Sequence, residues 1–269
     1  MSEKIKSNIA PVDLGAPEGI PRNSLILLSG NAGTGKTVLL CHLAMNFMLN
    51  NEPIIYVTLD DDSLSVVKVF ESFGWNLSEY IDKGLFKLID GFSFRLGAFK
   101  QQNLYHFAVK EVRPDNTLSI INAILELSDN VNNKGLVILD SLNELMFTLD
   151  VRGILDFVRT LRAVVSKGKN IVTLVTLHVT TDALVELKNN LEYLVDGIID
   201  TRIDPNLQEL GIPIKQMMVK KLRGAPTNPV WIPYVILNDG VHLVDQHKLA
   251  ALVKSKVKEA LGNIPTAQQ

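Results

Sequence analysis

Short apolar runs alternate with amphipathic stretches along most of the chain. Runs that are apolar at nearly every position predict buried strands, and apolar residues that recur at helical spacing predict amphipathic helices. The predicted strands cover residues 24–29, 53–59, 85–90, 135–140 and 171–177. The predicted helices cover residues 37–49, 63–73, 118–127, 151–167 and 184–194. This alternation indicates an α/β fold, with a mostly parallel sheet covered by helices on both faces.

The pattern changes after residue 197. Apolar runs then follow one another without helical segments between them, at 198–203, 216–222, 230–237 and 241–244. Asn238-Asp239-Gly240, between the last two runs, is a strong turn signal. We therefore expect an antiparallel C-terminal extension of the parallel sheet.

The chain is expected to form a single domain over residues 1–269. Residues 1–23 contain several prolines and glycines and predict an irregular lead-in, while residues 246–269 predict a C-terminal helix and tail. Residues 91–116 are the least regular internal stretch. A hydrophobic content of 46% with 21% charged residues is typical of a globular protein.

Charge and cysteine content narrow the class of protein. The formal net charge of −2 means that any nucleic-acid surface must be a local basic patch. The single cysteine, Cys41, excludes an internal disulfide framework and fits a reducing cytosol. The first residues lack the apolar run of a signal peptide, and no apolar run approaches the ~18 residues of a membrane helix. We therefore expect a cytoplasmic protein without a membrane contact.

A glycine-rich segment between the first apolar strand and the next helix matches the P-loop pattern G-x-x-x-x-G-K-T. Its residues, with the one that follows, are Gly30, Asn31, Ala32, Gly33, Thr34, Gly35, Lys36, Thr37 and Val38. Backbone N–H groups of such a loop cradle phosphate oxygens, the lysine reaches the outer phosphates, and the threonine hydroxyl ligates Mg²⁺. The helix N-terminus adds its dipole. A chance match is the alternative, and the strand–loop–helix context argues against it.

Asp140 ends the apolar run 136–139, which is the Walker B arrangement. There a carboxylate can hold Mg²⁺ through water, beside Thr37. The alternative is that Asp140 only caps the next helix. Its position about a hundred residues after the P-loop favours the metal role, so we predict Thr37 and Asp140 as the metal-binding residues.

Three carboxylates, Asp60, Asp61 and Asp62, follow the strand predicted over 53–59. They lie at the same end of the sheet as the P-loop. One interpretation is that they include a general base for water. The other is an N-cap cluster for the helix that begins near residue 63. The residues alone favour neither interpretation over the other.

Several segments carry a resemblance to a known family. They are Gly19-Ile20-Pro21, the 30–37 loop, Tyr56-Val57-Thr58-Leu59-Asp60-Asp61, Ser72-Phe73-Gly74-Trp75, the stretch 135–141 and Lys221-Leu222-Arg223-Gly224. Together they resemble the KaiC-type ATPases of the RecA superfamily, especially the single-domain archaeal KaiC-like proteins counted as paralogues of the recombinase RadA. The resemblance spans about residues 19–244. It implies a RecA-like P-loop NTPase core that binds ATP with Mg²⁺ and hydrolyses it.

The resemblance also implies roles for the carboxylates. The family's pair of glutamates falls on Asp60 and Asp61, and the first member is the water-activating base. Aspartate is one methylene shorter than glutamate, so slow hydrolysis is expected. The family's glycine-rich segment before Ile-Pro is altered here, at residues 14–19.

Lys221 and Arg223 alternate near the end of a predicted strand, so both side chains should leave one strand face. In similar proteins such a tip reaches the γ-phosphate held by the neighbouring subunit. This implies a homo-oligomer, a ring or filament, with ATP at the subunit interface; a solvated basic hairpin end is the alternative. His178 or Thr176 could sense the γ-phosphate, and a structural histidine is the alternative.

Basic and aromatic residues interleave in the 91–116 stretch, a combination that suits single-stranded DNA. They are Arg95, Lys100, Lys110 and Arg113 with Phe92, Phe94, Phe99, Tyr105 and Phe107. The loop after His178, with Thr180, Thr181 and Lys188, occupies the place of the recombinases' DNA-binding loop. Both segments could equally lie at a subunit interface.

The resemblance thus favours a regulator of homologous recombination or DNA repair, with single-stranded DNA and a recombinase or repair protein as partners. The alternative is a KaiC-like nucleotide-gated signalling or motor-assembly ATPase that does not bind DNA.

Overall fold

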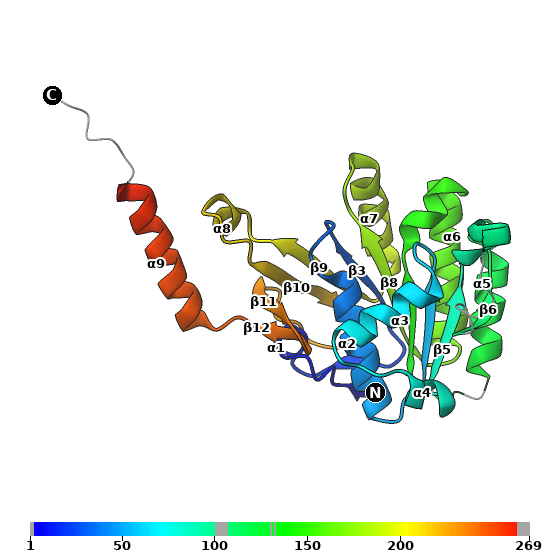
Figure 1. The fold of residues 1–269 in the computed structure, drawn as a ribbon. Helices are drawn as coiled ribbons and strands as arrows, with labels where there is room; N and C mark the ends of the chain where they lie inside the picture. The colour runs from blue at the N-terminus through cyan, green and yellow to red at the C-terminus, as the bar shows by residue number, and fades with distance from the viewer. Residues whose placement is uncertain (1–2, 100–106, 130, 132, 263–269) are drawn as a thin grey trace.

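The computed structural model of the chain describes residues 3–99, 107–129, 131 and 133–262 (Figure 1). Its strands are β1 (Lys4–Ile5), β2 (Ile20–Pro21), β3 (Leu25–Gly30), β4 (Ile54–Thr58), β5 (Phe86–Asp90), β6 (Ala108–Glu111), β7 (Leu136–Asp140), β8 (Val172–His178), β9 (Gly197–Ile203), β10 (Lys215–Leu222), β11 (Ile232–Leu237) and β12 (Gly240–Leu243). Its α-helices are α1 (Ala10–Gly15), α2 (Lys36–Leu49), α3 (Ser63–Ser72), α4 (Ser78–Asp82), α5 (Thr117–Ser128), α6 (Val151–Leu161), α7 (Asp182–Leu194), α8 (Pro205–Glu209) and α9 (Gln246–Gly262). Short 3₁₀ segments cover Ser93–Phe99 and Leu142–Phe147, and a π-helical turn covers Arg162–Lys167.

Ten of the strands form one sheet in the order β12-β11-β10-β9-β3-β8-β7-β4-β5-β6. The strands from β9 to β6 in this order run parallel to one another. β10, β11 and β12 continue the sheet in antiparallel pairing. This confirms the expected α/β fold, a mostly parallel sheet with an antiparallel C-terminal extension.

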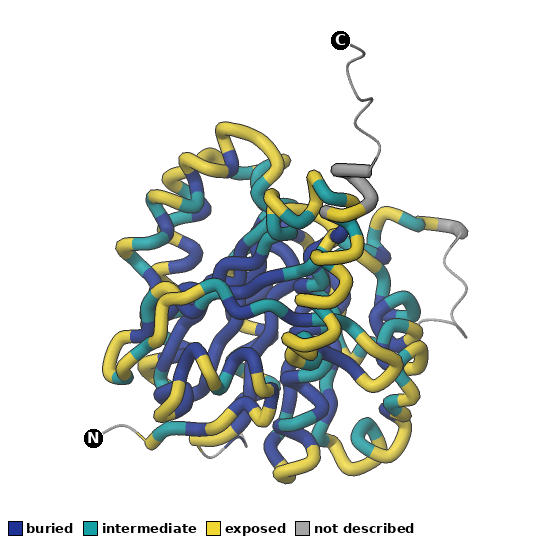
Figure 2. The backbone as a smooth tube through the Cα atoms, turned by 90° about the vertical axis from the view of Figure 1, so that its left-hand side faces the viewer, coloured by how far each residue is buried: buried dark blue, intermediate teal, exposed yellow. Residues whose placement is uncertain are grey.

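The sheet separates two apolar cores. Along β3, Ile26 and Leu28 face the core that contains α2 and α3, while Leu25 and Leu27 face the core that contains α5, α6 and α7. Because successive residues of a strand point to opposite faces, a strand between two cores must be apolar at every position. Figure 2 shows the strands as the buried centre of the molecule.

The structure corrects several expected elements. The 91–116 stretch is not irregular throughout, because β6 adds a parallel edge strand at residues 108–111. This strand alternates between half-buried and exposed positions, so it lacks the continuous apolar run of the central strands. α4 and α8, of five residues each, were not expected, and residues 10–15 of the lead-in form α1. The helix expected over 151–167 is α-helical only to residue 161, and a π-helical turn follows it.

α9 follows β12 and extends away from the sheet (Figure 1). Among the described residues, no helix is long and apolar enough to cross a membrane.

Candidate nucleotide-binding site

The glycine-rich loop joins the end of β3 to the start of α2. Gly30 has φ +151°, and a Cβ there would lie 2.2 Å from the Thr201 carbonyl oxygen of the neighbouring strand β9. Gly35 has φ +89°, and a Cβ there would lie 2.4 Å from Cδ1 of Ile236. The loop conformation therefore requires glycine at both positions, for space as well as for backbone freedom.

Two residues from distant strands fasten the loop. The Thr34 hydroxyl lies 2.8 Å from the Thr201 hydroxyl, and the Tyr234 hydroxyl of β11 donates to the Thr34 carbonyl. The tip of the loop, Asn31, Ala32 and Gly33, is exposed. Thr34 is buried and Val38 is half-buried. The tip of the loop is thus open to solvent, while Thr34 is held by hydrogen bonds to the sheet.

Lys36 is buried beneath this loop. Its ammonium donates to the carbonyl oxygens of Gly30 and Asn31, each at 2.9 Å. Burial lowers the pKa of Lys36 to about 8, although the nearby charges of Asp140 and Asp60 oppose the shift. A bound anion would relieve this desolvated charge, so the loop is suited to a polyphosphate.

Asp140, at the end of β7, is buried and accepts three hydroxyl hydrogen bonds. Oδ2 accepts from Tyr56 at 3.0 Å and from Thr37 at 3.4 Å, and Oδ1 accepts from Thr176. Burial raises the pKa of Asp140, and these hydrogen bonds oppose the rise. The structure thus brings together the two predicted metal-binding residues. Of the two residues predicted to sense the γ-phosphate, Thr176 is buried and its hydroxyl donates to Asp140. His178 is half-exposed and can contact a ligand.

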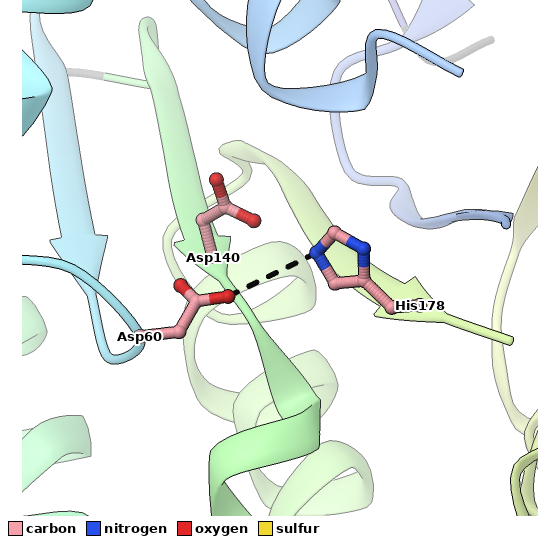
Figure 3. A group of neighbouring side chains, drawn as sticks. All are labelled: Asp60, Asp140 and His178. Atoms are coloured by element: carbon pink, nitrogen blue, oxygen red, sulfur yellow. Dashed lines mark ion pairs between the residues drawn. The ribbon is translucent and has the colours of Figure 1, made fainter. Parts of the chain in front are cut away.

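Asp60 lies two residues beyond β4 and turns toward Asp140 and His178, which end the neighbouring strands β7 and β8 (Figure 3). Ligand atoms of these three residues all lie within 4.8 Å of one another. Ser141 donates to Asp60 Oδ2 at 3.0 Å. Burial and the charge of Asp140 raise the pKa of Asp60, while burial and the charge of Lys36 lower the pKa of His178. Asp60 is therefore a stronger base than an ordinary aspartate, and the imidazole is neutral at pH 7.

The other two carboxylates of the Asp60–62 triplet have different surroundings. Asp62 caps α3, because its Oδ1 accepts from the Ser65 N–H at 2.9 Å. Asp61 is exposed, and its carboxylate accepts from the Asp62 N–H. The two interpretations of the triplet thus fall on different residues: Asp62 serves as the cap, and Asp60 faces the site.

Lys221 and Arg223 lie at the opposite end of the strands from the P-loop. The end of β10 pairs with the beginning of β9, with Leu222 opposite Gly197, whereas Gly30 lies opposite Thr201 further along β9. Lys221 Nζ donates to the Glu192 carbonyl at 2.5 Å, and Arg223 Nη2 donates to the Tyr193 carbonyl at 2.9 Å. Both cations therefore sit at the C-terminal end of α7, where the helix dipole favours them, and not beside the P-loop of their own chain.

The described basic residues of the 91–116 stretch are paired with acids. Arg95 bonds Glu144 at 2.8 Å, Arg113 bonds Asp115 at 2.9 Å, and Lys110 bonds Glu126. Lys100 and Tyr105 lie outside the described residues, as does the side chain of Phe99.

The loop after His178 begins with two exposed threonines, Thr180 and Thr181. Lys188, further along in α7, pairs with Asp200 at 2.8 Å, so its ammonium faces the sheet.

A family model described as "ATPase: KaiC" matches residues 5–248. The chain belongs to the KaiC family of ATPases. A UPF0273 protein of Methanopyrus kandleri is 28% identical over 259 residues, which cover 96% of this chain and 98% of that protein. A UPF0273 protein of Sulfurisphaera tokodaii is 27% identical over 242 residues, 89% of this chain and 82% of that protein.

A KaiC-like protein of Pyrococcus horikoshii, PH0186, shares the fold with a TM-score of 0.71 at 19% identity, over 91% of this chain and 100% of that one. The resemblance inferred from the motifs is thereby confirmed for the KaiC family and for the fold.

Several residues that support this KaiC-type site were not predicted from the sequence. Tyr56, Ser141, Thr201 and Tyr234 hold Asp140, Asp60 or the loop in place. Tyr56 carried a signal, since it places a phenolic hydroxyl among the apolar residues Ile54, Ile55 and Val57. A polar group inside a buried strand needs a partner, but the partner depends on the order of the strands in the sheet.

Proposed function

We propose that this protein binds ATP with Mg²⁺ at the carboxyl edge of its sheet and hydrolyses the ATP slowly. The observation that carries the proposal is the convergence of the P-loop, Thr37, Asp140 and Asp60 at the ends of neighbouring strands and the start of α2. Hydroxyl and carboxylate oxygens are the donors that Mg²⁺ prefers, so Thr37 and Asp140 fit this ion. Bound Mg²⁺ would neutralise charge on the phosphates.

Asp60 is proposed as the base that takes the proton of the attacking water. Its carboxylate is oriented by Ser141 and made more basic by burial and by Asp140. Lys36 would bind the outer phosphates, and His178, beside Asp60, would contact the γ-phosphate. The short aspartate side chain keeps its carboxylate near the sheet edge, which is the reason to expect slow turnover.

The matched test of the base compares Asp60→Asn with Asp61→Asn. Both substitutions remove one carboxylate, but only Asp60 faces the site. Loss of a general base typically costs ~10²–10⁴-fold in turnover, so Asp60→Asn should lose hydrolysis while it still binds ATP. Asp61→Asn should retain the wild-type rate. A loss of hydrolysis in Asp61→Asn alone would show that Asp61, and not Asp60, is the base.

We also propose that the site is completed by a second copy of the chain. Lys221 and Arg223 lie at the opposite end of the strands from the P-loop of their own chain, so they could reach only a neighbour's nucleotide. A head-to-tail contact of this kind closes into a ring or propagates as a filament. A cationic finger in trans is worth ~10³–10⁵-fold in phosphoryl transfer.

Mixing two inactive variants tests the shared site. Lys36→Ala removes the phosphate lysine, and Arg223→Ala removes the finger. Mixed assemblies should recover part of the activity, because some interfaces pair an intact P-loop with an intact finger. If labelled subunits exchange and no activity returns, the shared site is refuted.

The proposed setting is regulation of recombination or repair, in line with a RadA paralogue. One observation supports a contact with single-stranded DNA: the guanidinium carbons of Arg95 and Arg113 lie 4.7 and 4.9 Å from the centroid of the Phe94 ring. Such a cluster of an aromatic ring and cations could bind a base and its phosphate. Binding of a labelled oligothymidine, followed by anisotropy, should weaken in Phe94→Leu. Equal binding by Phe94→Leu and wild type would exclude this surface.

A further inference from the structure

We infer that Asp60, Asp140 and His178 form a binding site for a transition-metal dication such as Zn²⁺ or Co²⁺. This ion is chemically distinct from the Mg²⁺ proposed with ATP, and it requires no nucleotide. The three side chains come from the ends of three neighbouring strands and point toward one another (Figure 3).

The spacing of the ligand atoms suits an ion between them. His178 Nε2 and Asp60 Oδ2 are 3.8 Å apart, which is too long for a hydrogen bond. Two ligands that each lie ~2.0–2.2 Å from one zinc ion are separated by roughly 3 to 4 Å. All ligand atoms of the trio lie within 4.8 Å of one another, so the half-exposed Asp60 side chain would have to move closer to the other two for all three to bind one ion.

The two carboxylates lack a cationic partner of their own. Within the described part of the chain, neither Asp60 nor Asp140 has a lysine or arginine nitrogen within 4.0 Å. The ammonium of Lys36 points instead at the carbonyls of Gly30 and Asn31. A dication between the carboxylates would therefore neutralise charge that no described lysine or arginine contacts directly and that Lys36 offsets only from a distance.

The imidazole selects the kind of ion. Mg²⁺ prefers oxygen ligands in a near-ideal octahedron, whereas an imidazole nitrogen suits zinc and its first-row neighbours. His178 is held in place by its backbone, whose N–H and carbonyl bond the Asn143 side chain at 2.8 and 2.9 Å. Three protein ligands leave coordination positions open to water, as in catalytic zinc sites.

The side chains of His178 and Asp60 are 31% and 32% exposed, so an ion can enter from solvent. An ion bound to Asp60 would occupy the carboxylate that we propose as the base, and this consequence alone rests on the proposed function. Zn²⁺ would then inhibit hydrolysis instead of supporting it.

The test uses full-length protein without a histidine tag and without nucleotide. Co²⁺ alone is titrated in excess Mg²⁺ and followed by the visible absorption of the bound ion and by calorimetry, and Zn²⁺ is then added as a competitor. We expect one Co²⁺ per chain, displaced by Zn²⁺. His178→Gln should weaken Co²⁺ binding about tenfold or more, since loss of even an outer partner of a metal ligand costs 10–100-fold.

His247→Gln is the matched control, because His247 is exposed on α9, outside the trio; its Co²⁺ affinity should equal that of the wild type. The circular dichroism spectrum and urea midpoint of His178→Gln, compared with those of the wild type, show whether the variant is folded and keep the metal test independent of the ATPase proposal. Undiminished Co²⁺ affinity in His178→Gln, or no stoichiometric Co²⁺ binding by the wild type, would overturn the inference.

Discussion

The buried ammonium of Lys36 should make the protein less stable near neutral pH than at alkaline pH. Its ordinary pKa of 10.5 falls to about 8 in the folded protein, and the residue is only 3% exposed. Each pKa unit corresponds to about 1.36 kcal/mol of differential interaction. The folded state therefore carries a penalty of about 3 kcal/mol while Lys36 is charged.

The penalty has a defined pH window. Below pH 8 the lysine is protonated in both states, and the full penalty is present. Between pH 8 and 10.5 the folded protein loses the proton that the unfolded chain still holds, so stability rises with pH. From pH 7 to pH 10 this contribution should add ~2.5 kcal/mol to the free energy of unfolding.

Lys36→Met isolates this contribution, because methionine has a similar shape and no charge. Urea unfolding of both proteins at several pH values between 7 and 10, at one protein concentration, gives the difference in their free energies of unfolding. That difference should move by ~2.5 kcal/mol in favour of the wild type across the range. Parallel curves, with a constant difference, would refute the buried-charge argument.

Three further predictions concern the same loop and its neighbours. The affinity for ATP should fall as pH rises above 8, by up to about tenfold per unit, because binding requires a protonated Lys36; calorimetry at pH 7.5, 8.5 and 9.5 checks this, and a flat profile would contradict it. Asp62→Ala should lower the free energy of unfolding by ~1 kcal/mol through loss of the α3 cap, while Asp61→Ala should not. Gly35→Ala should lower the urea midpoint more than Gly33→Ala, since both have positive φ but only a Cβ at Gly35 meets Ile236; equal shifts would argue against that contact.

The alternation of elements and the P-loop could be predicted because both are local properties of the sequence. Buried parallel strands are continuously apolar, and the loop needs glycine where the backbone turns. The edge strand β6 was missed because it ends the sheet formed by the described residues and pairs there only with β5, so its composition is mixed.

The rest of the site depends on which strands lie side by side. That Tyr56 and Thr176 both donate to Asp140 follows from β4 and β8 flanking β7. Similarly, the alternation of side chains along a strand predicts that Lys221 and Arg223 lie on one face. Their position at the end of the strands away from the P-loop depends on the antiparallel pairing of β10 with β9.

We propose that the loop at residues 30–37 binds the phosphates of ATP. A calorimetric titration of Mg-ATP into wild type and into Lys36→Ala tests it most directly, with circular dichroism to show that the variant is folded. We expect saturable binding by the wild type and an affinity about 10- to 100-fold lower in Lys36→Ala, which corresponds to the loss of hydrogen bonds to a charged group. Equal ATP affinity in a folded Lys36→Ala would show that this loop does not bind the phosphates.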